Sequence, residues 1–307
     1  MKDQADNLRK AIEKLGPVRI PDQGAVPLTR RNTGPARIYA VTSGKGGVGK
    51  TSVSVNLALA LCEQRYKTLI IDADVGLANV EVLFGLTPGH SLMDSISGEK
   101  PIRDIICDGP YGIKLISGGS GVEELARMDE SRLAAFTAEL SELDNDFDVI
   151  IIDTGAGISD TVLSIAVAAD EAIVVITPEP TALTDAYAMI KAIVIRDRIK
   201  IMRIIINKAE NDSEAGEVMS KLTQVSDKFL DLKLRKLGYI LNDPLVVRSI
   251  KRQQPFLISS PYSQTSKSIR EIALRLMDGN TLASTDKNRG LTGFLDRIAK
   301  FVNIQLK

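Results

Sequence analysis

Short apolar runs alternate with longer helical stretches along most of the chain, and this alternation sets the expected fold. The runs that read as strands are residues 38–43, 67–72, 113–117, 148–153, 171–177, 201–207 and 237–241. Strands that alternate with helices in this way are typical of a mostly parallel sheet covered by helices on both faces. The sequence therefore predicts an α/β fold, and no internal repeat is visible in it.

Breaks in the alternation divide the chain into segments. Residues 1–15 read as a short helix, and the prolines and glycines of residues 16–36 predict a linker. Residues 37–280 carry the strand–helix alternation and are expected to form the main domain. Residues 281–289 read as a second linker, and residues 290–307 read as a final helix.

The final helix is amphipathic. Its apolar side chains recur at helical spacing and form one stripe, made of Leu291, Phe294, Leu295, Ile298, Phe301 and Val302. Between residues 286 and 307 there are five basic residues and two acidic ones, which leaves a surplus of three positive charges. Such a helix can lie in the surface of an anionic membrane, and it can also pack on its own domain. The pattern alone leaves both roles open.

Charge and composition narrow the class of protein. The 39 basic residues balance the 39 acidic ones, so bulk charge does not predict nucleic-acid binding. No apolar run approaches the ~18 residues of a membrane-spanning helix, and the N-terminus lacks the apolar segment of a secretory signal. The two cysteines, Cys62 and Cys107, do not have the spacing of a metal site. We expect a cytoplasmic protein.

Glycines and lysines gather between the first strand and the helix that follows it. Residues 44–51 read Gly-Lys-Gly-Gly-Val-Gly-Lys-Thr and satisfy the phosphate-binding pattern G-x-x-x-x-G-K-[ST]. Glycines let backbone N–H groups turn toward phosphate, and the helix N-terminus adds a partial positive charge there. The expected nucleotide-binding residues are Gly44, Lys45, Gly46, Gly47, Val48, Gly49, Lys50, Thr51 and Ser52.

Three aspartates complete the predicted chemistry. Lys50 should contact the β- and γ-phosphates, and Thr51 should ligate Mg²⁺ through its hydroxyl. Asp72 and Asp74 end the second strand, at the edge of a parallel sheet where ligands bind. One of them can join the Mg²⁺ shell and the other can orient the attacking water. Asp153 ends the fourth strand in the Walker-B arrangement. The predicted metal-binding residues are Thr51, Asp72 and Asp153, and acidic turns or caps are the alternative for the aspartates.

The sixth strand indicates which base is bound. It ends at Asn207, whose side-chain amide can read a purine edge through paired hydrogen bonds. GTPases use Asn-Lys-x-Asp at such a position, and this chain has Glu210 where the guanine-reading aspartate would stand. We therefore expect ATP as the nucleotide.

These motifs together resemble the MinD/ParA ATPases. The resemblance rests on Lys45 as a second lysine in the loop, on the run 72–79 and on the run 153–157, and it covers about residues 37–280. It implies an ATP–Mg²⁺-binding ATPase that forms a homodimer with two nucleotides sandwiched face to face. Lys45 would contact the partner subunit's nucleotide, and Asp74 would position the hydrolytic water. Lys45, Lys50 and Asp74 are thus the expected catalytic residues.

The two ends of the chain narrow the resemblance further. Residues 3–9, Asp-Gln-Ala-Asp-Asn-Leu-Arg, resemble the DQAxxLR motif of the flagellar-number regulators called FlhG, FleN or YlxH. This implies stimulation of an FlhF-type GTPase through Gln4 and Arg9, and flagellar C-ring proteins as partners. It also implies that the final helix docks in the monomer and binds the inner face of the membrane in the ATP state. A generic amphipathic N-terminal helix is the alternative for residues 1–15.

Three other interpretations of the function compete with the flagellar one. A MinD-type division-site ATPase shares the motor and the tail, but such chains normally begin almost at the loop strand, whereas here 36 residues precede it. A ParA-type DNA-partitioning ATPase needs a basic surface, and the balanced charge together with the amphipathic tail makes nucleic acid an unexpected partner. An electron-transferring protein of the nitrogenase iron-protein type needs two bridging cysteines, and Cys62 falls inside the post-loop helix.

Overall fold

The computed structural model of the chain describes residues 34–74, 79–118, 121, 124, 130–278 and 290–305. The predicted N-terminal helix with its DQAxxLR-like motif, most of the first linker and the second linker lie outside the described residues. Within the described part, no helix is both long enough and apolar enough to cross a membrane.

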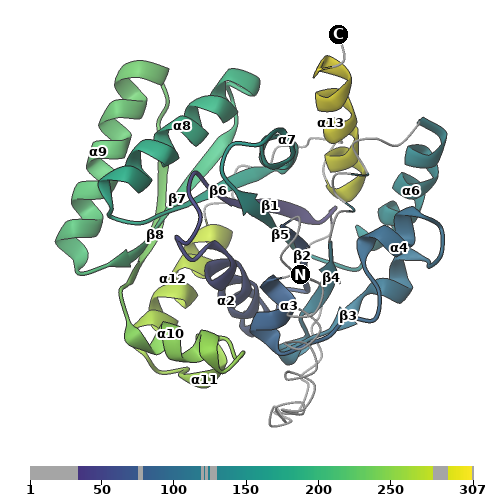
Figure 1. The fold of residues 1–307 in the computed structure, drawn as a ribbon, viewed down its shortest axis with the longest axis horizontal. Coiled ribbons are helices and arrows are strands. Elements are labelled where there is room, and N and C mark those ends of the chain that lie inside the picture. Colours follow the sequence, from purple (N-terminus) through teal and green to yellow (C-terminus); the bar gives the residue numbers. More distant parts are fainter. Residues whose placement is uncertain are drawn as a thin grey trace, which may run out of the picture.

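The described strands form one sheet in the order β3-β4-β2-β5-β1-β6-β7-β8 (Figure 1). Its strands are β1 (Arg37–Ser43), β2 (Thr68–Ala73), β3 (Cys107–Asp108), β4 (Lys114–Ser117), β5 (Val149–Ala156), β6 (Glu171–Ile176), β7 (Ile201–Ala209) and β8 (Arg235–Leu241). Every pairing is parallel except the one between β3 and β4. The predicted α/β fold is therefore confirmed, and every predicted strand is present.

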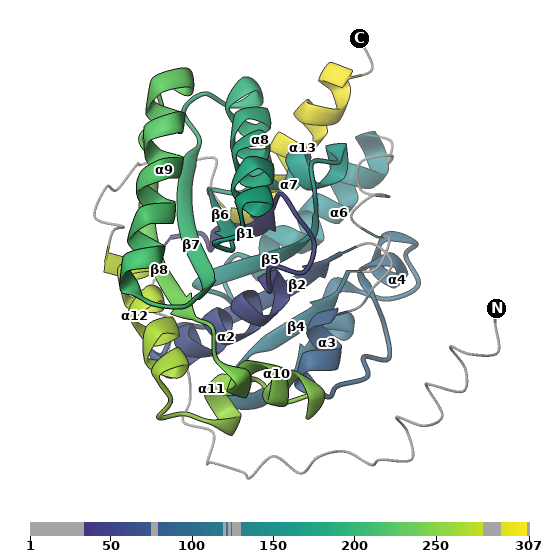
Figure 2. The same ribbon diagram turned by 60° about the vertical axis from the view of Figure 1, so that its left-hand side comes forward.

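Helices cover both faces of this sheet. They are α2 (Lys50–Glu63), α3 (Asn79–Phe84), α4 (Leu92–Ile96), α6 (Glu130–Leu143), α7 (Asp160–Ala168), α8 (Pro180–Arg196), α9 (Asp212–Leu230), α10 (Pro244–Lys251), α11 (Phe256–Ser259), α12 (Gln264–Asp278) and α13 (Gly290–Gln305), with 3₁₀ turns at 102–105 and 110–112. The apolar residues of α2 and α12 pack on one face, and those of α6, α7, α8, α9 and α13 pack on the other. Figure 2 turns the molecule so that these layers can be followed.

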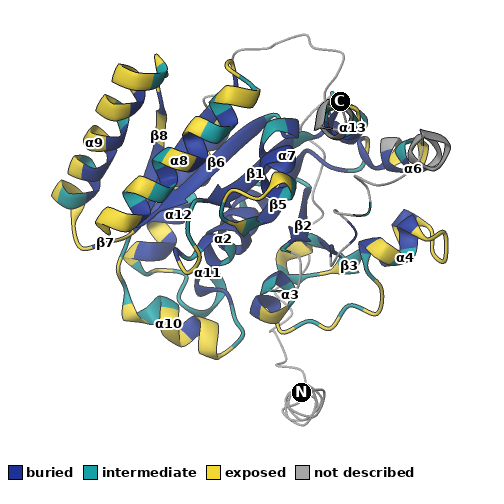
Figure 3. Cartoon of the chain, turned by 45° about the horizontal axis from the view of Figure 1, so that its top comes forward, coloured by how far each residue is buried: buried dark blue, intermediate teal, exposed yellow. Residues whose placement is uncertain are grey.

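Burial on both faces explains why the strands read as continuous apolar runs. Along β5, Val149 and Ile151 join the cluster under α2, and Ile150 and Ile152 join the cluster under α6 and α13. Successive side chains of a strand point to opposite faces, so a strand covered on both sides needs apolar residues at every position. Figure 3 shows the strands buried and the exposed residues on the outer sides of the helices.

The short strand β3 was not predicted. It contains two residues, Cys107 and Asp108, which pair with Leu115 and Lys114 of β4. A segment of this length has no hydrophobic period, and only the edge of the neighbouring strand makes it a strand.

Candidate nucleotide site and the docked C-terminal helix

The glycine-rich loop joins β1 to α2 at the edge of the sheet where the parallel strands end. Gly47 and Gly49 have φ angles of 79° and 86°, in the left-handed region that favours glycine. A Cβ atom on Gly49 would also overlap the side-chain amide of Asn207, and one on Gly44 would overlap the backbone of Asp185 in α8. The loop is therefore held in its shape by backbone freedom and by close neighbours.

The end of β7 supports the loop from the side. The Nδ2 atom of Asn207 donates a hydrogen bond to the carbonyl of Val48 at 2.7 Å, and the Nζ atom of Lys208 donates to the carbonyl of Gly47 at 2.8 Å. Asn207 is almost fully buried. In this arrangement Asn207 holds the phosphate loop, and its predicted reading of the purine base stays a prediction.

Replacement of Asn207 by aspartate separates these two roles. A carboxylate cannot donate to the Val48 carbonyl, and two oxygens would then face each other in a buried place. We expect weaker binding of ADP and GDP by a similar factor, together with a lower melting temperature. Calorimetry with each nucleotide measures this. A change in the ratio of the two affinities would instead favour base reading by Asn207.

Lys50 and Asp153 form a buried ion pair at the centre of the site. The Nζ atom of Lys50 lies 3.1 Å from Oδ1 of Asp153, and the two side chains are 7% and 0% exposed. The Ser54 hydroxyl, one turn further along α2, donates to the same Oδ1 at 2.7 Å. The other oxygen, Oδ2, is buried and has no hydrogen-bond partner among the described residues.

Asp72 lies beside Asp153 on the neighbouring strand, but its oxygens are already engaged. Oδ1 accepts from the backbone N–H of Asp74, and Oδ2 accepts from those of Asn79 and Val80, at 2.9–3.0 Å. Burial raises the pKa of Asp72 to about 6; Asp153 adds to the rise and the three amides oppose it. Asp72 thus fixes the start of α3, and its predicted contact with Mg²⁺ stays a prediction.

Asp74 lies beside the end of the Walker-B strand, β5. Its Oδ2 accepts from Nδ2 of Asn79 at 3.3 Å, and a Cβ atom on Gly155 would stand 3.4 Å from its Oδ1. Partial burial raises the pKa of Asp74, with Asp153 adding to the rise and Lys50 opposing it. Asp74 therefore lies within the electrostatic influence of Lys50 and Asp153, and its predicted role in orienting the attacking water stays a prediction.

Lys45 points to its own chain in this structure. Its Nζ atom lies 2.8 Å from Oε2 of Glu179 and 3.2 Å from Oγ1 of Thr181, both at the start of α8. The pair is largely exposed, and Lys45 lowers the pKa of Glu179. Lys45 is separate from the Lys50–Asp153 pair, so the two lysines of the loop have different surroundings.

These residues fit a nucleotide with Mg²⁺. Mg²⁺ prefers oxygen ligands, keeps several waters and is usually held by one or two carboxylates plus phosphates. Oδ2 of Asp153, which has no partner in the part of the chain that the structure describes, is an acceptor whose burial is costly until a cation or a donor reaches it. Thr51 is half-buried at the start of α2, next to Lys50.

Sequence reasoning missed Ser54, Lys208 and Glu179. Ser54 carried a usable signal, because it stands four residues after Lys50 and therefore lies on the same helix face. Glu179 lies in no motif, and Lys208 stands next to Asn207 but nothing in the sequence indicates its contact with the carbonyl of Gly47.

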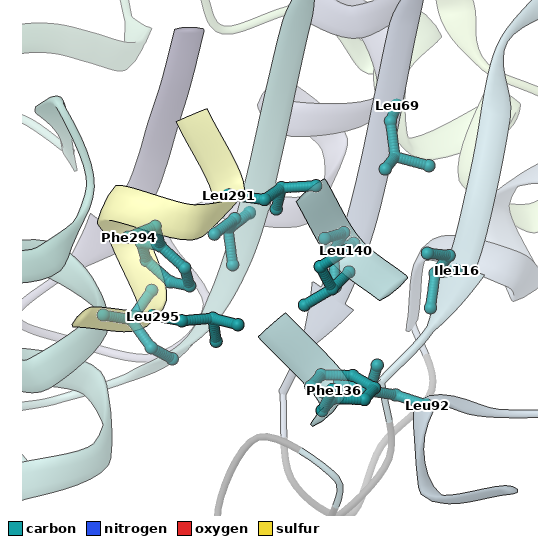
Figure 4. Close-up of a pocket in the computed structure, with 11 residues that line it drawn as sticks. Leu69, Leu92, Ile116, Phe136, Leu140, Leu291, Phe294 and Leu295 are labelled. Carbon is teal, nitrogen blue, oxygen red and sulfur yellow. The ribbon is translucent and has the colours of Figure 1, made fainter. Parts of the chain in front are cut away.

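The final helix, α13, is docked on the body of the protein. Its residues Leu291, Phe294, Leu295 and Ile298 are 1–6% exposed and pack among side chains of α6, α7 and the sheet. Figure 4 shows several of them around a small apolar cavity of about 30 Å³, with Phe136 and Leu140 of α6 opposite. The part of the predicted apolar stripe from Leu291 to Ile298 is thus turned inward in this state.

Polar contacts fasten α13 at two points. Asp144 accepts hydrogen bonds from the backbone N–H of Leu291 at 2.7 Å and of Thr292 at 3.5 Å. Arg297 donates from Nε to the carbonyl of Ala168 at 2.5 Å and from Nη2 to Oδ1 of Asp170 at 3.0 Å. Burial raises the pKa of Asp144, and the amides of α13 oppose that rise.

Helix α7 connects the nucleotide edge to α13. It begins at Asp160, shortly after β5 and its Asp153, and it ends at Ala168, whose carbonyl accepts from Arg297. A shift of α7 caused by the segment after Asp153 would therefore act directly on the contacts of α13.

Comparisons with known proteins find similarity over most of the chain. The model of the ParA family, described as the NUBPL iron-transfer P-loop NTPase, matches residues 35–277. The chain is 39% identical over 242 residues to the antiactivator FleN of Pseudomonas aeruginosa, which covers 79% of this chain and 86% of that protein. It is 35% identical over 274 residues to the flagellum site-determining protein YlxH of Helicobacter pylori, with coverage of 88% and 92%.

A solved structure extends the likeness to three dimensions. A chain of the MinC:MinD cell division protein complex of Aquifex aeolicus aligns with a TM-score of 0.64 at 26% identity, covering 79% of this chain and 96% of that one. The family description names iron transfer, which would need a thiol that can bind iron. Cys62 lies inside α2, where burial raises the pKa of its thiol to about 12. A thiol in this setting is poorly suited to bind iron as a thiolate.

Proposed function

The chain belongs to the MinD/ParA family of P-loop NTPases and is an ATP hydrolase of that kind, and from that premise we propose that it is a membrane-cycling switch that regulates flagellar number and placement. ATP and Mg²⁺ bind at residues 44–52, and two chains then pair across their nucleotides. Hydrolysis separates the pair and resets the switch.

Each residue of the site has a role in this cycle. Lys50 leaves Asp153 and contacts the β- and γ-phosphates, while the loop amides hold the phosphate oxygens. Thr51 and Oδ2 of Asp153 would hold Mg²⁺, and the ion would neutralise charge on the phosphates. Asp74 accepts a hydrogen bond from the attacking water and orients it.

Lys45 changes partner when the dimer forms. In the described state it contacts Glu179 and Thr181, in an exposed setting where ion pairs are weak. The loss of these contacts is therefore a small obstacle, and Lys45 can swing to the nucleotide of a facing chain. ATP binding and dimerisation are coupled by this residue.

The buried stripe of α13 is the observation that supports a membrane cycle. One apolar face has two possible sites, the groove between α6 and α7 and an anionic membrane, and it cannot occupy both. Movement of α7 on nucleotide binding would weaken the contacts of Arg297 and release α13. The protein is then cytoplasmic at rest and peripheral on the inner membrane face with ATP.

Similarity supports the flagellar branch of the family. Proteins named for flagellar regulation align with most of this chain, and residues 3–9 carry the DQAxxLR-like motif. We infer that this motif stimulates an FlhF-type GTPase and that flagellar C-ring proteins are further partners. A MinD-type division role is the alternative, because MinD proteins also align with the chain, at 29% identity for that of Bacillus subtilis.

A change of Asp144 to alanine tests the membrane cycle without altering the tail itself. The variant loses the two hydrogen bonds that Asp144 accepts from backbone N–H groups at the start of α13. An acceptor of this kind stabilises a helix start by about 1–2 kcal/mol, so the docking equilibrium of α13 should shift ~5- to 30-fold. Co-sedimentation with anionic vesicles should show wild-type binding with a non-hydrolysable ATP analogue and not with ADP. The variant should bind measurably with ADP as well.

Asp146→Ala is the matched control, because this neighbouring carboxylate pairs with Arg103 on the surface and has no hydrogen bond or ion pair with the described residues of α13. It should behave as wild type. Absence of wild-type vesicle binding in both nucleotide states would refute the membrane cycle and favour a soluble or DNA-partitioning role.

The flagellar branch has its own test. The full chain should accelerate GTP hydrolysis by an FlhF-type GTPase, and a Gln4→Ala variant should not, while its ATP binding is retained. Equal stimulation by both chains would contradict the role given to residues 3–9.

A further inference from the structure

Ser54 contacts the Walker-B carboxylate from inside the post-loop helix. Its hydroxyl is fully buried and lies 2.7 Å from Oδ1 of Asp153 and 3.1 Å from the carbonyl of Lys50. The hydroxyl has one proton, which the shorter distance and the charged acceptor direct to Asp153. Ser54 is therefore a donor to Asp153 and not only a helix serine bonded to its own preceding turn.

The two oxygens of Asp153 are used unequally. Oδ1 receives both Lys50 and Ser54, which stand one helical turn apart on α2. Oδ2 receives no donor among the described residues, although it is buried. The carboxylate is thus held through one oxygen and keeps the other available for a ligand.

Nucleotide binding changes this balance. In the proposed function Lys50 turns to the phosphates. Oδ1 of Asp153 then loses the Nζ donor of Lys50 at 3.1 Å and keeps the hydroxyl donor of Ser54 at 2.7 Å. Ser54 then becomes the remaining described side chain that prevents the carboxylate from rotating about its Cα–Cβ and Cβ–Cγ bonds.

We propose that Ser54 is a positioning residue that keeps Oδ2 of Asp153 directed to Mg²⁺ once Lys50 has moved to the phosphates. The inference rests on the proposed ATP–Mg²⁺ site and assigns Ser54 a part in it. Groups that orient a metal ligand affect metal affinity strongly without touching the metal.

The test compares ADP binding by calorimetry with and without Mg²⁺, in the full chain. Ser54→Ala should bind ADP without Mg²⁺ as wild type does, since Lys50 and the loop are unchanged. The gain in affinity that Mg²⁺ produces should fall by about tenfold or more. Ser54→Thr keeps the hydroxyl and should restore the gain.

A matched control removes an equivalent hydroxyl elsewhere. Ser164 is buried in α7 and donates to the carbonyl of Thr161, so Ser164→Ala should retain the full Mg²⁺ gain. Melting temperatures measured without nucleotide identify any variant that is poorly folded. If Ser54→Ala is such a variant, the test is made on Ser54→Thr, which should retain the Mg²⁺ gain.

Two results would overturn the proposal. One is a full Mg²⁺ gain in Ser54→Ala. The other is an equal loss of ADP affinity with and without Mg²⁺, which would make Ser54 a packing residue. Failure of the wild type to bind ADP, or to gain affinity from Mg²⁺, would instead refute the nucleotide site from which the inference proceeds.

Discussion

Replacement of Lys50 by alanine should abolish nucleotide binding and, at the same time, destabilise the protein without nucleotide. The first effect follows from the loss of the cation that contacts the β- and γ-phosphates. The second follows because Asp153 is fully buried and would lose the partner of its buried ion pair. Breaking a buried pair by removal of one partner costs about 3–5 kcal/mol. Calorimetry with ADP and urea denaturation measure the two effects.

Lys45→Ala is the matched control in the same loop. Its pair with Glu179 is exposed, so the free energy of unfolding should stay close to that of wild type. ADP binding should be retained, and the ATP-dependent dimer should be lost on a sizing column. Retained ADP affinity in Lys50→Ala would contradict the assignment of the loop, and an ATP dimer in Lys45→Ala would contradict the proposed swing of that lysine.

Asp74→Asn should trap the ATP-bound dimer. The amide keeps the size of the side chain and can still accept from Asn79, but it cannot draw a proton from the attacking water. Loss of a group of this kind typically lowers a rate about 10²- to 10⁴-fold. Phosphate release should fall by that range while ATP binding remains.

The same variant gives a structural readout. Because hydrolysis is the step that separates the pair, Asp74→Asn with ATP and Mg²⁺ should elute as a dimer, and with ADP as a monomer. A monomer in both states would show that Asp74 is needed for pairing as well as for hydrolysis. Such a result would contradict the prediction that loss of water positioning alone traps the dimer.

The fold and the core of the site could be predicted because their signals are local. The run 44–51 carries its glycines and lysines in one stretch, and the strands ending at Asp72 and Asp153 are apolar at successive positions. In a parallel sheet the ends of such strands must meet at one edge, so their aspartates were expected to come together. The structure places Asp72 opposite Asp153 in adjacent strands.

The roles of single atoms could not be predicted in the same way. The sequence places Asn207 near the nucleotide. Whether its side chain contacts a base or the carbonyl of Val48 depends on how the fold brings together two residues that are 159 positions apart in the sequence. Asp72 and Asp74 look equivalent in the sequence, but in the structure the oxygens of Asp72 already accept from the backbone N–H groups of Asp74, Asn79 and Val80. Hydrogen bonds are decided by ångström-scale geometry, which residue spacing does not contain.

The amphipathic tail shows what the sequence determines and what only the tertiary structure decides. The sequence by itself determined that a helix with one apolar stripe is expected over residues 290–307, since the helical period is a local property, and the structure has α13 at Gly290–Gln305. It left open what the stripe contacts. Tertiary structure decided this, because the groove exists only when α6, α7 and the sheet are assembled, and because Asp144 and Ala168 then stand where α13 can reach them. Burial is a property of the assembled layers, and the surface that receives a stripe comes from distant parts of the chain.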